Sequence, residues 1–194
     1  YGFVKYTGNS DRGFRVTGVQ LEIKDYPTSY IKTTGVRAYR YSELVSTNEI
    51  DNINPNEGVV YLETSSLDEK DISARYISIG DGTTSLSGIL FRYYTSTNQF
   101  SALYFDGGFI CTITVTLDNS SNMNKIAFKY AENDFALWVN GIQVGTDLTG
   151  TPSVALKKIH LSKQDGYDGF TGKIKSIRIL PYMSDEDLEE ITYQ

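Results

Sequence analysis

The sequence has very little of the two residues that most often carry covalent or acid–base chemistry. It contains one cysteine, Cys111, and one histidine, His160, in 194 residues. A single cysteine cannot form an intramolecular disulfide, so the size of the core must stabilise the fold. No apolar run approaches the ~20 residues that cross a bilayer, and no basic start with an apolar stretch marks a signal peptide. We therefore expect a soluble chain without membrane insertion.

Basic residues and prolines are also scarce. The 18 Lys and Arg are outnumbered by 24 Asp and Glu, which gives a net charge of -6 without any basic stripe. Such a chain repels nucleic acid on balance, so we expect no nucleic-acid partner. Only four Pro accompany 17 Gly, 15 Tyr and nine Phe. Aromatic residues fit a pleated surface and glycine suits tight turns, so this composition predicts an all-β domain.

Short apolar segments follow one another at the spacing of a β-sandwich. Gly, Asn, Asp or Ser separates nearly all of them. The predicted strands are residues 58–65, 73–79, 88–95, 100–106, 109–117, 125–130, 135–139, 142–145, 154–161 and 172–180. Residues 14–24 form a further predicted strand, which is separated from the others by a polar break at residues 52–57.

The second half of the chain carries the clearest local signals. Apolar residues alternate in residues 126–130 and again in residues 135–139, with a turn at residues 132–134 between them, which indicates a hairpin with one buried face. Asn140-Gly141 then predicts a type I′ turn, because this turn needs positive φ at both central residues. The last long strand loses its alternation near Ser176, where we expect a bulge. Ser184 precedes three acidic residues and predicts the N-cap of one short helix.

Two sequence patterns in residues 125–192 resemble a known fold family. The run KIAFKYAENDFALWVNGIQVGTD and the later run DGYDGFTGKIKSIRILPYMSDEDLEEIT are similar to the end of laminin-G-like and pentraxin-like concanavalin A domains. In that family a hairpin ending in VNG precedes a GxIxxIRI strand and a short helix. The resemblance implies a jelly-roll sandwich of two facing antiparallel sheets, with about six or seven strands each.

A second resemblance lies nearer the N-terminus. Residues 19–46, VQLEIKDYPTSYIKTTGVRAYRYSELVS, look like the junction found in tail-fibre and other virion proteins of bacteriophages. There the junction closes one β module and opens a laminin-G-like one. The resemblance implies that residues 1–51 are the end of an upstream β module plus a junction, and that residues 52–194 are the concanavalin A-like domain.

Catalytic groups lack the partners that enzymes of this fold would need. Glycan-cleaving relatives place two carboxylates at alternate positions of one strand, but Glu63 has Tyr61 and Ser65 as its same-face neighbours. His160 lies between two apolar residues that point the opposite way, which indicates a solvent-side strand position. Cys111 shares a face with apolar residues and is predicted to be a core residue. We therefore predict that the chain is not an enzyme.

A binding site can still be predicted, although each candidate has a simpler explanation. Trp138 faces away from Leu137 and Val139, and Tyr167 lies in a glycine-rich loop with Asp165 and Asp168. These four residues, Trp138, Tyr167, Asp165 and Asp168, are the predicted glycan-binding residues. Large aromatics of a sandwich are more often core residues, however.

Calcium is the one cofactor that the sequence leaves open. Asp165 and Asp168, with Asp81 and Asp106 from other loops, could supply the oxygen ligands that calcium prefers. The alternative is that Asp-Gly pairs simply form turns.

Together these features predict a non-catalytic structural or receptor-binding module of a phage virion, such as a tail or head fibre. The expected partners are glycans of the bacterial surface or the environment, or the host-cell surface, together with other virion proteins. The expected assembly is a homo-oligomer of the full-length protein, located in the virion and thus extracellular. The alternative is a carbohydrate-binding module of a secreted bacterial polysaccharide-degrading protein, which would be monomeric.

Overall fold

The computed structural model describes residues 45–67, 74–83 and 87–193, together with Tyr30 and Lys32. The chain divides into two compact units, Tyr1–Tyr41 and Ser42–Gln194. The predicted strand at residues 14–24 and most of the junction at residues 19–46 lie outside the described residues. The predicted boundary between residues 51 and 52 therefore remains a prediction.

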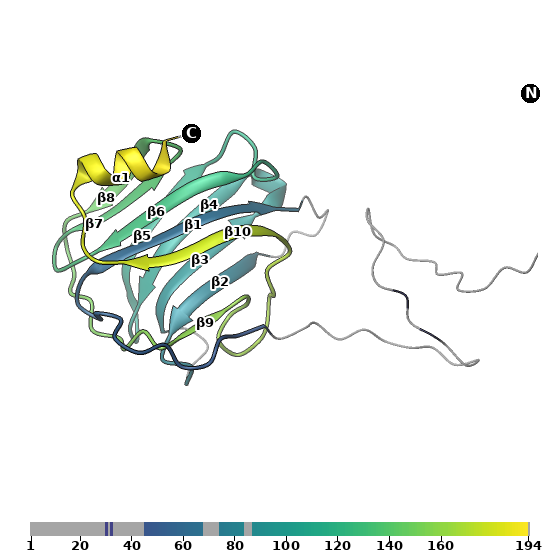
Figure 1. The fold of residues 1–194 in the computed structure, drawn as a ribbon, viewed down its shortest axis with the longest axis horizontal. Coiled ribbons are helices and arrows are strands. Elements are labelled where there is room, and N and C mark those ends of the chain that lie inside the picture. The colour runs from purple at the N-terminus through teal and green to yellow at the C-terminus, as the bar shows by residue number, and fades with distance from the viewer. Residues whose placement is uncertain (1–29, 31, 33–44, 68–73, 84–86, 194) are drawn as a thin grey trace, which may run out of the picture. The chain divides into compact units, whose positions relative to one another are not determined.

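The second unit is a two-sheet antiparallel jelly-roll sandwich with one short helix, as predicted (Figure 1). The first sheet has the strand order β10-β1-β6-β7-β8, and the second sheet has the order β5-β4-β3-β2-β9. The described residues thus form five strands in each sheet, fewer than the resemblance implied. The strands are β1 (Gly58–Ser66), β2 (Arg75–Gly80), β3 (Gly88–Tyr94), β4 (Gln99–Phe105), β5 (Phe109–Thr116), β6 (Asn124–Tyr130), β7 (Phe135–Val139), β8 (Ile142–Asp147), β9 (Lys158–His160) and β10 (Gly172–Leu180).

The main core lies between the two sheets. Alternate residues of each strand point inward, so the aromatic side chains of both sheets meet there. Phe91 of β3 contacts Phe128 of β6 edge to face, with ring centroids 6.1 Å apart. The fully buried aromatic residues are Tyr93, Tyr104, Tyr130, Phe91, Phe100, Phe128 and Phe135. Cys111 belongs to this core, as predicted, and its burial raises the pKa of the thiol to about 12.

The helix α1 (Asp185–Thr192) packs on the outer face of the first sheet over β6, β7 and β8 (Figure 1). Ser184 caps it as predicted, and its hydroxyl accepts a hydrogen bond from the backbone N–H of Asp187. The Asp187 carboxylate accepts in turn from the backbone of Ser184, which completes a capping box. Leu188 is fully buried in a second apolar cluster that includes Tyr61 and Trp138.

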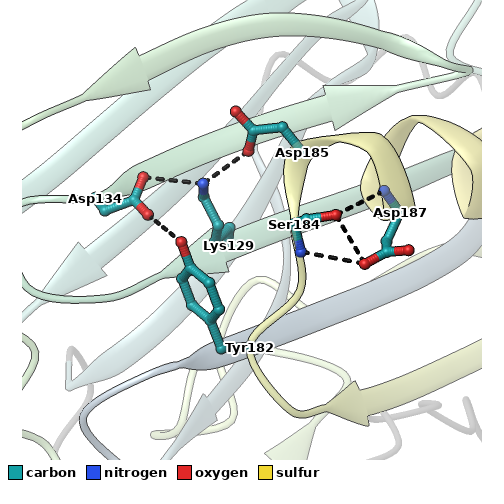
Figure 2. Close-up of polar contacts among 6 residues, drawn as sticks. All are labelled: Lys129, Asp134, Tyr182, Ser184, Asp185 and Asp187. Carbon is teal, nitrogen blue, oxygen red and sulfur yellow. Dashed lines mark hydrogen bonds and ion pairs between the residues drawn. The ribbon is translucent and has the colours of Figure 1, made fainter.

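A buried lysine joins α1 to the first sheet (Figure 2). Lys129 of β6 lies between two carboxylates, with Nζ 2.9 Å from Asp134 and 2.8 Å from Asp185. Tyr182 donates its hydroxyl to Asp134 and places its ring 5.5 Å from the Lys129 ammonium. Burial pulls the pKa of Lys129 down, but the hydrogen bonds to Asp185 and Asp134 raise it overall.

The predicted turn and bulge are both present. Asn140 and Gly141 have φ of 51° and 81°, as a type I′ turn requires. The pairing of β1 with β10 shifts between Glu63 and Thr64, which face Ser176 and Ile174 and leave Lys175 as the extra residue. This is the bulge that the broken alternation near Ser176 predicted.

One predicted strand is much shorter in the structure. Residues 154–161 were expected to be extended, but only Lys158–His160 form β9. The preceding coil lets Val154 and Leu156 fill the core, and the Tyr104 hydroxyl accepts the backbone N–H of Val154 at 3.0 Å. On its free side β9 is hydrogen-bonded by residues 45–50, since the N–H of Thr47 donates to the carbonyl of Ile159.

Candidate functional site

The outward-facing side chains of the second sheet form registered rows across its strands. One row runs from Tyr76 of β2 through Arg92 and Ser101 to Thr114 of β5, and each member is directly paired with the next. A neighbouring row joins Tyr94, Gln99 and Thr116. Because alternate residues point to opposite faces, both rows lie on the face away from the core.

Arg92 is the central polar group of this face. Its guanidinium lies 4.9 Å from the centre of the Tyr94 ring, and its Nη2 donates to the Ser101 hydroxyl at 3.3 Å. Ser101 in turn shares a 2.9 Å hydrogen bond with the Thr114 hydroxyl. The Arg92 Nε is buried and has no hydrogen-bond partner among the described residues. The guanidinium is thus held in place while part of its donor capacity remains unused.

The rest of the face combines apolar and aromatic groups. Leu90 and Leu103 are paired with each other and lie in neither apolar cluster, yet they are only 2% and 4% exposed. Beyond them, Phe105 and Phe109 form an edge-to-face pair with centroids 5.2 Å apart. Phe109 is exposed. Four residues of extended chain separate this pair from the Arg92 row, a distance of about 13 Å.

The second sheet carries no negative charge of its own. None of its five strands contains an Asp or Glu residue, although the whole chain has 24. The first sheet differs in this respect, since Glu63 lies on β1 and Asp147 on β8.

A loop at residues 162–168 borders the face beside β2. The Ser78 hydroxyl donates to the carbonyl of Ser162 at 2.7 Å, and the Tyr76 N–H donates to the carbonyl of Asp168 at 3.1 Å. Lys163 forms an ion pair with Asp168 and places its ammonium 4.8 Å from the Tyr76 ring centre. The hydrogen bond to Asp168 raises the pKa of Lys163.

Three of the predicted glycan-binding residues lie in this loop. Tyr167 is 72% exposed, as its glycine-rich surroundings indicated. Asp165 accepts the backbone N–H of Tyr167 at 3.0 Å, and Asp168 binds Lys163. The structure therefore brings Tyr167, Asp165 and Asp168 close to Tyr76 at the border of the outer face. Whether they bind a ligand remains a prediction.

Trp138 lies elsewhere in the molecule. The alternation of β7 was interpreted correctly, because Trp138 faces away from Leu137. That face is covered by α1, and Trp138 is only 7% exposed in the cluster with Leu188. Its ring thus has no open side for a sugar, and the structure lends its predicted binding role no support.

The four predicted calcium ligands are engaged separately. Asp81 accepts from the backbone and side chain of Thr83, and the backbone hydrogen bond lowers the pKa of its carboxyl. Asp106 accepts from the Ser153 hydroxyl, while Asp165 and Asp168 have the partners given above. Within residues 45–67, 74–83 and 87–193, no group of three or more His, Cys, Asp or Glu side chains could hold a metal ion. The donor set therefore does not fit a calcium site.

Glu63 and His160, the residues considered above for acid–base chemistry, are both held within the fold by neighbouring residues. Glu63 is buried and accepts a 2.7 Å hydrogen bond from Lys175. His160 is paired with Ser78 at the edge of the second sheet, and its Nε2 is buried without a hydrogen-bond partner among the described residues. Burial, followed by the charge of Lys158, lowers the pKa of His160.

The sequence did not single out Arg92, Tyr76 or Tyr94. The alternation of β3 places Arg92 and Tyr94 on the face opposite Phe91. An arginine and a tyrosine two residues apart on one face of a strand were therefore a signal that the sequence offered. The row that joins them to Ser101 and Thr114 depends on the register between strands, which the sequence does not specify.

No protein-family model matches the chain, and no curated protein matches it. Solved structures resemble its fold. A CBM40 module of the Ruminococcus gnavus IT-sialidase, bound to α2,3 sialyllactose, has a TM-score of 0.54 at 17% identity and covers 76% of this chain and 98% of its own. A SAP-like pentraxin from Limulus polyphemus has a TM-score of 0.56 at 10% identity, with coverage of 77% and 74%.

The binding domain of botulinum neurotoxin DC, in complex with SialylT, has a TM-score of 0.57 at 11% identity. The match covers 77% of this chain and 39% of that one. These likenesses define the class of the fold, a lectin-like jelly-roll sandwich.

In the part of the chain that the structure describes, no helix is long and apolar enough to span a membrane.

Proposed function

We propose that this chain is a non-catalytic glycan-binding module and that it binds sugar on the outer face of the second sheet. The observation that carries the proposal is the row from Tyr76 to Thr114, which places an aromatic ring, a guanidinium and two hydroxyls side by side. Sugars offer CH groups to aromatic rings and hydroxyls to polar side chains, so such a mixture suits them.

The fold comparisons support a sugar as the ligand. Two of the similar structures, the Ruminococcus gnavus module and the botulinum neurotoxin domain, are described in complex with sialylated ligands. Because the identities are 17% and 11%, the likeness concerns the fold, and the choice of face rests on the side chains of this chain.

A glycan array followed by titration calorimetry tests the proposal. We expect Tyr94→Ala to weaken binding of the array hit about three- to tenfold, the range that an aromatic contact of about 0.5–1.5 kcal/mol provides. The matched control is Tyr193→Ala, which removes a 70% exposed ring beyond α1. Equal losses in both variants, or a chain that binds no glycan, would contradict the proposal.

Two proposals remain for the kind of protein to which this module belongs. The junction resemblance at residues 19–46 supports a receptor-binding module of a phage fibre, and the carbohydrate-binding neighbours support a module of a secreted bacterial polysaccharide-degrading protein equally well. The mass of the full-length protein in solution separates them. An oligomer that adheres to bacterial surface glycans supports the fibre, whereas a monomer that binds one plant or algal polysaccharide supports the secreted protein.

A further inference from the structure

We propose that the outer face of the second sheet selects acidic sugars and that Arg92 binds their carboxylate. This inference rests on the proposed function, since it names the class of glycan that the same face would take. It also assigns the preference for acidic over neutral sugars to one residue, Arg92.

Arg92 differs from the cations of the domain that form ion pairs. Lys129 has two carboxylate partners, Lys163 is paired with Asp168, and Lys175 with Glu63. Arg92 has no carboxylate partner among the described residues, and the strands around it contain none. A half-buried guanidinium without a counter-ion is costly to desolvate, and an anionic ligand would supply the missing charge.

The guanidinium is also fixed before a ligand arrives. Tyr94 stacks against one side, and Ser101 accepts one N–H while it is itself hydrogen-bonded to Thr114. A planar guanidinium binds a planar carboxylate through two parallel hydrogen bonds. Because the side chain is already ordered, a carboxylate gains these bonds with little loss of rotamer freedom.

The neighbours of Arg92 favour a carboxylate that belongs to a sugar. Tyr76 is paired with Arg92 across the strands and Tyr94 follows it on β3, so both provide aromatic surface, while Gln99 and the exposed Thr114 provide groups for hydroxyls. Lys163 is 4.8 Å from the Tyr76 ring at the border of the face, where its charge is paired with that of Asp168. The composition of the face therefore fits a sialic or uronic acid better than a free anion.

The test compares acidic probes with neutral partners of the same skeleton. Calorimetry or biolayer interferometry measures binding of 3′-sialyllactose against lactose, and of trigalacturonate against its methyl ester. We expect the intact chain to prefer at least one acidic probe over its neutral partner by about tenfold or more, as hydrogen bonds to a charged group provide. Arg92→Gln should remove that preference. Arg92→Lys should keep only part of it, because lysine has the positive charge but not the two parallel N–H donors of the guanidinium.

Arg178 provides a matched control on the opposite side of the sandwich. It also lies over a tyrosine ring, 5.4 Å from the centre of Tyr61, and its Nε donates to the Ser176 hydroxyl at 3.2 Å. Arg178→Gln therefore removes an arginine with the same kind of local contacts, and we expect binding to stay within about twofold of the parent. Unchanged melting temperatures would exclude loss of folding in the variants.

The outcomes separate this inference from the proposed function. Binding of neutral and acidic probes with equal affinity would overturn the acidic preference and leave glycan binding in place. Equal losses for both probe types in Arg92→Gln would likewise overturn the role assigned to Arg92. A preference for a sulfated sugar over every carboxylated probe would overturn the choice of carboxylate, and no binding of any probe by the folded chain would contradict both proposals.

Discussion

Lys129 illustrates how a single charged residue can be accommodated in a sheet of apolar neighbours. Its side chain is 5% exposed, while the two carboxylates that bind it, Asp134 and Asp185, are 32% and 52% exposed. The lysine therefore depends on its partners, whereas the carboxylates can also bind water. Since Asp185 belongs to α1 and Asp134 to the turn after β6, the ion pairs connect three segments of the chain.

We predict that Lys129→Ala destabilises the domain by about 1–3 kcal/mol, because the hydrogen bonds to charged groups and the packing of the lysine stem are lost. Denaturant unfolding followed by circular dichroism measures this. The control is Lys125→Ala on the same strand, where Nζ donates only to the carbonyl of Tyr193 and the cost should stay within about 0.5 kcal/mol. Equal costs for both variants would show that the ion pairs contribute little.

His160 provides a pH prediction at the same scale. Its pKa is lowered in the folded state by burial and by Lys158, so the unfolded chain binds a proton more readily than the folded one. The contribution to stability is complete above the unfolded value of 6.5 and is lost as the pH falls below it towards the folded pKa. His160 is the only histidine, so no other imidazole adds to this effect.

The expected result is a melting temperature that falls between pH 7 and pH 5.5 in the parent and falls less in His160→Gln. Thermal melts of both proteins in matched ionic strength provide the comparison. If the two proteins lose the same amount over this range, then His160 is not the group responsible.

At the scale of the element, α1 covers the part of the outer face of the first sheet that β6, β7 and β8 form. Leu188 is fully buried against the cluster that contains Trp138, the only tryptophan of the chain. We predict that Leu188→Ala costs about 2–5 kcal/mol and shifts the tryptophan emission to longer wavelength, since water gains access to the indole. Ile142→Ala, at a 66% exposed position of β8, serves as the control and should change neither property.

Most elements could be predicted from the sequence because their signals are local. The type I′ turn needs only Asn140-Gly141, and the helix needs Ser184 followed by acidic residues. The short β9 could not be predicted in the same way. Its approach through Val154 and Leu156 has apolar residues at alternate positions, and only the tertiary contacts with Tyr104 show that this segment is coil.

The site was less predictable than the fold because it depends on contacts between distant residues. The buried position of Trp138 results from a helix that begins 47 residues later in the chain, as the positions of Trp138 and Asp185 show. Similarly, Arg92 meets Ser101 and Thr114 only through the registers of β3 with β4 and of β4 with β5. The loop around Tyr167 was found because glycine and aspartate are local signals of exposure.

At the scale of the whole molecule, the outer faces of the two sheets differ in how their charges are paired. The first sheet is covered by α1 over β6, β7 and β8, and its Glu63–Lys175 and Lys129 ion pairs neutralise part of its charge within the domain. The second sheet lacks carboxylates and keeps Arg92 without a counter-ion among the described residues. A chain of net charge -6 thus presents one face without acidic side chains on its strands, which is the basis of the proposed acidic-sugar site.

The last prediction concerns calcium, which would have to bind aspartates from several loops of this domain at once. A metal ion held at 100 times its dissociation constant would stabilise the fold by about 2.7 kcal/mol, which corresponds to roughly 5–10 °C for a domain of this size. The four predicted ligands are instead bound to separate partners, among them Thr83, Ser153 and Lys163. We therefore predict that calcium or a chelator changes the melting temperature by less than about 1 °C. A larger rise with calcium that Asp168→Asn abolishes would show that the loop at residues 162–168 rearranges to bind the ion, because Asp168 must leave Lys163 to do so.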